Sequence, residues 1–139
     1  MGKATSTPKT AAKLAATAGN SETFQALRAL LSKHVPPLKV LSDATDRYEL
    51  ITPKPFHNKG IRKDNAYFGA IMIKKDYVGL YLMFIYDEPK NADKLGADLK
   101  KTLKGKSCFH IKKLDEILIK QIEAALEDGL SYYKKESAI

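Results

Sequence analysis

The stretch Asn65–Tyr86, NAYFGAIMIKKDYVGLYLMFIY, decides the fold of this chain. Two apolar runs, rich in β-branched and aromatic residues, flank the polar group KKDY at 74–77, and this pattern is typical of a β-hairpin. A two-residue turn in the middle of that group would pair its first and last residues and so set the register of both strands. We therefore predict a long antiparallel hairpin here.

The two faces of the predicted hairpin differ in composition. The register pairs Ile71 with Leu80 and Ile73 with Val78 on one face, which is aliphatic and suited to burial beneath helices. The other face carries aromatic, methionine and small side chains, as adaptable contact surfaces do. An antiparallel sheet with helices on one side needs only one apolar face. The second face therefore predicts a binding surface, made of Phe68, Met72, Tyr81 and Met83.

The rest of the chain predicts helices at both ends and short elements between them. In order, we expect a helix from Ser21 to about His34, a strand over 48–52, a loop over 54–64, a short helix over 97–103, a strand over 107–112, and a helix from Asp115 to about Lys135. This order predicts an α+β fold, with an antiparallel sheet of four to six strands and the terminal helices packed on one face.

Composition and length predict one domain over residues 21–139. Residues 1–20 contain no acid and no aromatic side chain, which predicts a flexible basic tail. Met1-Gly2 with Ser6 also fits a loose myristoylation pattern, and a transit peptide lacking arginine is the other alternative. A single cysteine fits a cytoplasmic location. The charged turn in the hairpin interrupts the oiliest stretch, so no membrane span is expected.

Few residues form a pattern that is typical of a catalytic, metal-binding or anion-binding site. Cys108 and His110 lie two apart, hence on one face of a strand, but a nucleophilic or metal-binding pair needs a further group to complete it. We expect a structural thiol beside a surface histidine, with this pair as a weak metal candidate, and we name no catalytic residue. Four lysines near the short helix complement its negative end and form a candidate anion site: Lys100, Lys101, Lys104 and Lys106.

The net charge of +8 raises the question of nucleic acid. Tyr81, Phe68 and Tyr77 on an open sheet, flanked by Lys74, Lys75 and Arg62, have a loose similarity to the base-stacking surfaces of RNA-binding sheets. The glycine-aromatic pattern of such sheets is absent, and the basic residues are spread along the chain rather than gathered in one segment. Nucleic acid is therefore an alternative and not the preferred partner.

Three segments together resemble the YdhG-like domain family: FGAIMIKK at 68–75 with YVGLYLM at 77–83, LKKTLKGKSCF at 99–109, and the closing helix to Tyr133. The resemblance covers residues 21–135, and its most specific part is LKGKSCF at 103–109 followed by a helix that begins with aspartate. It implies a fold similar to frataxin, with two helices on one side of an antiparallel sheet. It also implies iron delivery as a function, although the acidic first helix of frataxins is reduced here to Glu22.

These observations predict a cytoplasmic protein that is not an enzyme and needs no cofactor. Its preferred function is binding, through the apolar and aromatic sheet face, of a small apolar ligand, a protein partner or a second copy of the chain in a homodimer. A frataxin-like iron chaperone and a nucleic-acid-binding sheet are the two alternatives.

Overall fold

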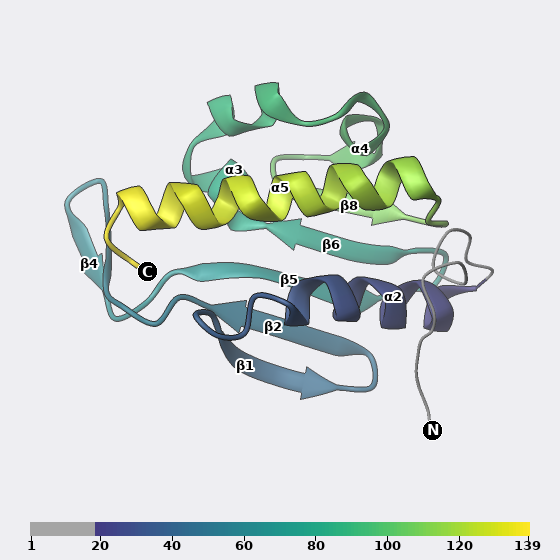
Figure 1. Ribbon diagram of the computed structural model, residues 1–139, viewed down its shortest axis with the longest axis horizontal. Coiled ribbons are helices and arrows are strands. Elements are labelled where there is room, and N and C mark those ends of the chain that lie inside the picture. The colour runs from purple at the N-terminus through teal and green to yellow at the C-terminus, as the bar shows by residue number, and fades with distance from the viewer. Residues whose placement is uncertain (1–18) are drawn as a thin grey trace.

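A six-stranded antiparallel sheet is the centre of the computed structural model, which describes residues 19–139 (Figure 1). The predicted basic tail therefore lies almost wholly outside the described residues. The strands lie in the order β1 (Lys39–Ala44), β2 (Arg47–Ile51), β5 (Tyr67–Ile73), β6 (Val78–Leu82), β8 (Cys108–Ile111) and β7 (Leu103–Lys104).

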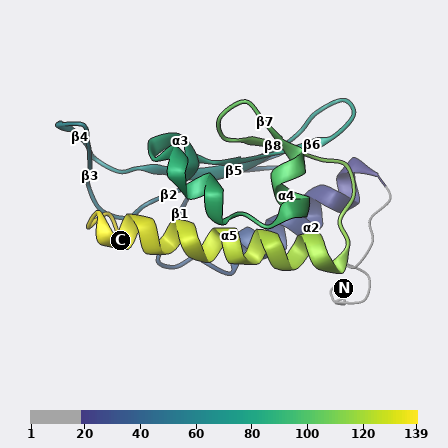
Figure 2. The same cartoon turned by 90° about the horizontal axis from the view of Figure 1, so that it is seen from above.

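Two long helices cover one side of this sheet. Helix α2 (Asn20–Ser32) and helix α5 (Glu116–Lys135) both lie below the sheet in Figure 2. Their apolar side chains and those of the central strands form the core, in which Leu27, Ile71 and Leu126 are fully buried. The Asp115 side chain begins α5 by accepting a hydrogen bond from the Leu118 amide at 2.8 Å. The predicted α+β architecture with terminal helices is confirmed.

The central hairpin has the predicted register. Ile71 pairs with Leu80, Ile73 with Val78, and the Lys74 amide donates a hydrogen bond to the Tyr77 carbonyl at 2.9 Å. The pairing follows from the alternation of side chains between the two faces of a strand. A slip of one residue would move the aliphatic pairs, Ile71 with Leu80 and Ile73 with Val78, out of the core.

The prediction that Phe68 lies on the second face is wrong. Strand β2 pairs Leu50 with Gly69 and Ile51 with Tyr67, so Phe68 is the extra residue of a β-bulge. The bulge directs its ring beneath α5, where Phe68 is 0% exposed and its Cε1 lies 3.2 Å from the position of a Cβ added at Gly129. One extra residue thus moves one of the two aromatic side chains of the predicted surface into the core.

The second strand of the hairpin also ends earlier than predicted. Strand β6 stops at Leu82, and Met83 begins the short helix α3 (Met83–Asp87). The chain then continues through a 3₁₀ helix, η1 (Pro89–Lys94), and helix α4 (Ala97–Thr102) into the edge strand β7. Burial of Phe84 and Ile85 within the core holds α3 in place.

The segment predicted as a loop over 54–64 contains a second, two-stranded sheet. Strands β3 (Phe56–Asn58) and β4 (Ile61–Lys63) are joined by Lys59 and Gly60, whose φ angles are +52° and +82°. Positive φ at both positions is the requirement of a type I′ turn, which is the tightest hairpin connection. The segment is therefore a short, regular hairpin at one end of the main sheet (Figure 1).

Within residues 19–139, no helix has the length and apolar character needed to cross a bilayer.

Candidate functional site

The side of the sheet that faces away from α2 and α5 is the first candidate site. Side chains alternate along each strand, so the neighbours of the buried Ile71, Leu80 and Phe109 point to this side. We call it the open face. Its members come from four strands and one turn: Arg47, Glu49, Tyr67, Ala70, Met72, Tyr77, Gly79, Tyr81, Cys108 and His110.

Tyr81 lies at the centre of the open face. A Cβ added at Gly79 would meet the Tyr81 ring at 3.0–3.2 Å, so this ring lies flat along its own strand over the glycine. A side-chain hydrogen bond joins Tyr81 to Cys108 on the neighbouring strand. Burial, this hydrogen bond and nearby charges raise the pKa of Tyr81 to about 12, which keeps its hydroxyl neutral at physiological pH.

Two further aromatic groups are held in place beside Tyr81. The Tyr77 ring stacks on the His110 imidazole, with centroids 3.8 Å apart and planes 12° apart. The Tyr67 hydroxyl donates a hydrogen bond to Glu49, whose carboxylate also lies 3.6 Å from the Arg47 guanidinium. Partners within the chain therefore fix these rings before any other molecule binds.

The predicted surface residues are divided by the structure. Met72 and Tyr81 lie on the open face, as the predicted register requires, and both are half-buried. Met83 lies beyond the end of β6 and lines a separate pocket, whereas Phe68 is in the core. The open face is consequently less hydrophobic than the predicted surface, and it contains more aromatic and polar side chains.

The predicted anion site is distributed over α4, β7 and the turn between β7 and β8. Lys100 and Lys101 end α4, where they complement its C-terminus, and Lys104 pairs with Cys108 at the edge of the sheet. The Lys106 ammonium lies 5.7 Å from the centre of the Tyr86 ring. All four lysines are exposed, so the candidate is a basic edge and not an enclosed site.

Cys108 and His110 share one face of β8, as predicted, but each has another partner. Cys108 is hydrogen-bonded to Tyr81, and His110 is stacked with Tyr77. Cys108 and His110 therefore do not form an activated pair. Across residues 19–139, no group of three or more histidine, cysteine, aspartate or glutamate side chains is arranged to hold a metal ion.

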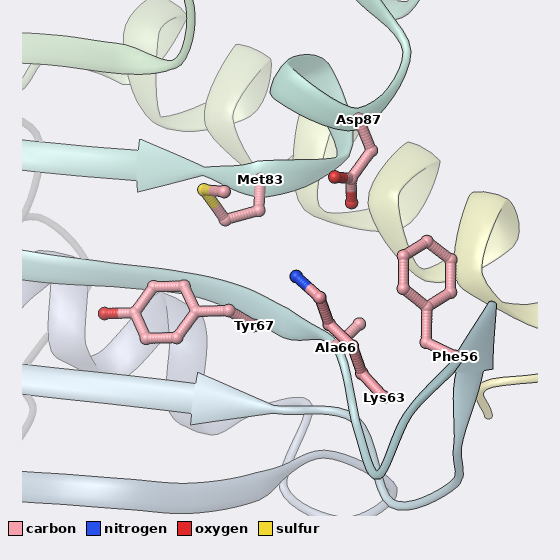
Figure 3. Close-up of a pocket in the computed structure, with 6 residues that line it drawn as sticks. All are labelled: Phe56, Lys63, Ala66, Tyr67, Met83 and Asp87. Atoms are coloured by element: carbon pink, nitrogen blue, oxygen red, sulfur yellow. The ribbon is translucent and has the colours of Figure 1, made fainter. Parts of the chain in front are cut away.

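A pocket that the sequence did not predict lies around Asp87, at the end of α3. Its volume is about 50 Å³, and its lining comes from β3, β4, β5 and α3: Phe56, Lys63, Ala66, Tyr67, Met83 and Asp87. Figure 3 shows the Lys63 ammonium and the Asp87 carboxylate reaching into the same space from different elements. Sequence alone offered no signal, because Asp87 is one acid at the start of a polar segment.

Tertiary contacts hold the Asp87 carboxylate. The Tyr133 hydroxyl of α5 donates a hydrogen bond to it at 2.7 Å, and the Asn58 amide of β3 donates another at 3.3 Å. Burial raises the pKa of Asp87 above its ordinary value, while the Tyr133 hydrogen bond and the charges of Lys63 and Lys59 oppose that shift. Asp87 therefore joins the β3–β4 hairpin to α5 while half-buried.

Two substitutions at this carboxylate should separate its hydrogen bonds from its charge. Asp87→Ala leaves the buried Tyr133 hydroxyl without its acceptor, which costs about 1–3 kcal/mol. Asp87→Asn keeps the shape and an acceptor oxygen, so it should be more stable than Asp87→Ala by a similar amount. Urea unfolding at pH 7 measures both variants, and equal stabilities would show that the hydrogen bond to Tyr133 contributes nothing.

The pH dependence of Asp87→Asn provides a second readout. A raised carboxyl pKa means that the folded state holds its proton more tightly than the unfolded chain does. Asp87 therefore lowers stability progressively as pH rises from the ordinary value of 3.8 through the raised pKa. The stability of Asp87→Asn relative to the natural chain should increase across that window. A difference that stays constant or shrinks would contradict the direction of the shift.

Comparison of the chain with protein-family models, curated proteins and solved structures finds no match to any of them. The resemblance to the YdhG-like family, and with it the frataxin-like label, therefore stays a prediction.

Proposed function

We propose that this protein is a non-catalytic binding protein that holds its partner on the open face of the sheet. The observation that carries the proposal is the one-sided placement of α2 and α5, which leaves a row of half-buried aromatic side chains without a covering helix (Figure 2). Aromatic side chains supply a large contact area and are enriched among the residues that dominate binding energy.

The fixed geometry of the open face supports this proposal. Tyr81 lies on Gly79, Tyr77 is stacked, and Tyr67 is hydrogen-bonded, so little side-chain freedom remains to be lost on association. Ordering a mobile side chain at an interface costs about 0.5–1.5 kcal/mol, and rings that are already ordered avoid part of that cost. Preorganised aromatic rings are what a binding surface requires.

The shape of the site favours a flat or extended partner over a small apolar ligand. Pockets for drug-sized molecules have volumes of roughly 300–1,000 Å³. The pocket beside the open face, around Asp87, measures about 50 Å³ and contains a carboxylate and an ammonium group. The proposed binding area is the surface of the sheet itself.

Binding of small planar fragments to the full chain, followed by NMR, tests the proposal. We expect shifts of backbone amides to cluster at Met72, Gly79, Tyr81 and His110. Tyr81→Ala should weaken the best fragments by about 5–30-fold, equivalent to about 1–2 kcal/mol. Ile117→Ala is the matched control, because Ile117 is an exposed apolar residue (59%) on the helical side. Clustering around α5 or the Asp87 pocket would overturn the proposal.

A further inference from the structure

Resting on the proposed function, we infer that the partner of the open face is a single-stranded nucleic acid. Its phosphates would lie against the basic turns that border this face, and its bases would stack on the aromatic rings of the sheet. Three observations carry the inference: the distribution of charge in space, the position of the rings, and the poor fit of a second copy.

Seven of the basic residues lie in three segments that are separated in sequence, the β3–β4 hairpin and the turns that follow β5 and β7. Figure 2 shows the turns that follow β5 and β7 on the side of the sheet away from α5, and β4 extends to that side as well, while Phe56 of β3 packs against Tyr133 of α5. These segments, residues 56–64, 74–77 and 104–107, contain seven basic residues and two acids, whereas α2 and α5 together contain four basic residues and five acids. The positive charge therefore borders the open face.

These segments expose several of their basic side chains. Lys59 lies in the I′ turn of the β3–β4 hairpin and is exposed, whereas Arg62 forms an ion pair with Asp64 at 3.0 Å and Lys63 lines the Asp87 pocket. Lys104 and Lys106 are likewise exposed at the β7 edge of the main sheet, next to the beginning of β8. Exposed lysine and arginine side chains at such positions can neutralise phosphates and release their counterions, which is the main source of affinity for nucleic acid.

The aromatic groups lie between these basic borders. Tyr81, the Tyr77–His110 stack and Tyr67 come from neighbouring strands and hairpin ends of one sheet. Bases of any identity stack on such rings, and each stacked base contributes about 1–3 kcal/mol. A duplex hides the faces of its bases, so a surface of this kind selects single strands.

A second copy of the chain fits the open face less well. A face-to-face dimer would bring the lysine-rich turns of both copies together, and like charges in an interface cost several kcal/mol. The acid of the open face, Glu49, does not offset this charge, because it is already engaged by Tyr67 and Arg47. Charge complementarity therefore points to a polyanion.

Fluorescence anisotropy with labelled twelve-nucleotide oligo(dT) and oligo(U) tests the inference on the full chain. We expect binding at 50 mM salt that weakens steeply by 200 mM. Tyr81→Ala should weaken it by roughly 5–150-fold, corresponding to the loss of one stacked base. Tyr77→Ala tests the same stacking from the turn, and Tyr81→Phe, which retains a ring, should bind nearly as well as the natural chain.

The charge contribution has its own readout and control. Lys104→Gln with Lys106→Gln should lower the slope of log affinity against log salt by about 1.4, because each phosphate contact to a single strand contributes about 0.7. Lys134→Gln with Lys135→Gln removes the same charge from the exposed end of α5 and should leave the slope unchanged. An equal effect of both pairs would mean that only net charge matters, and would overturn the inference.

The remaining outcomes separate the inference from the proposed function. Equal affinity for a duplex of the same length, or full affinity in both tyrosine-to-alanine variants, would exclude stacking and overturn the inference. Absence of oligonucleotide binding at 50 mM salt would also overturn it, while planar fragments that still cluster on the open face would leave the proposed function standing. A concentration-dependent dimer blocked by Tyr81→Ala would replace the nucleic acid by a second copy.

Discussion

Phe68→Ala is expected to lower the free energy of unfolding by about 3–5 kcal/mol, the usual cost of removing a buried phenylalanine ring. The ring is fully buried beneath Gly129 of α5, and its centroid lies 5.9 Å from that of Tyr133. Tyr133, whose ring packs beside Phe68, is also held by Asp87, and this contact opposes movement of α5 into the resulting cavity. Urea unfolding followed by circular dichroism measures the change.

Met72→Ala is the matched control for this prediction. Met72 lies on the same strand as Phe68, but it is half-buried on the open face. We expect a loss of about 1 kcal/mol, typical of a substitution outside the core. Similar losses for the two variants would contradict the β-bulge, since without it Phe68 and Met72 would share one face.

Gly69→Ala should have the second-largest effect, about 3 kcal/mol, at the upper end of the usual cost of overpacking. A Cβ at Gly69 would lie 2.5 Å from the carbonyl oxygen of Tyr81. That oxygen belongs to the backbone of the neighbouring strand, so it cannot rotate away as a side chain could. Relief requires the strands to separate beside the bulge, which weakens the centre of the sheet.

Gly79→Ala provides the comparison for Gly69→Ala. The closest atoms to a Cβ at Gly79 belong to the Tyr81 ring, at 3.0–3.2 Å, and this half-buried ring can swing outward. We expect a stability loss well below that of Gly69→Ala, together with displacement of Tyr81 that is visible in its ring proton shifts. Equal destabilisation by both substitutions would show that the Tyr81 ring is as immobile as the backbone.

Patterns within short stretches of sequence were enough to predict much of the fold. Alternation of apolar residues placed Ile71 opposite Leu80, and the cap at Asp115 and the stripe that follows it placed α5 to its last residue, Lys135. Such features depend on neighbours within a few residues, so they can be recognised in a single sequence. The lysine and glycine of the β3–β4 turn were also visible, but the short strands around them were not.

The candidate sites depended on contacts that no local pattern contains. Asp87 meets Tyr133 46 positions away and Asn58 29 positions away, and only the packing of α5 and the small hairpin brings them together. The lysines of three turns that are separated in sequence lie around the same sheet for a related reason, since the topology of the sheet places those turns.

By itself the sequence determined the class of fold, the central register and the two terminal helices, because hydrophobic periodicity and capping act locally. The tertiary structure alone decided which aromatic side chains remain accessible. One β-bulge moved Phe68 into the core, and Gly79 made room for Tyr81 to lie flat on the open face. A bulge depends on how two strands fit against each other and against a helix, and that fit exists only when the whole chain is folded.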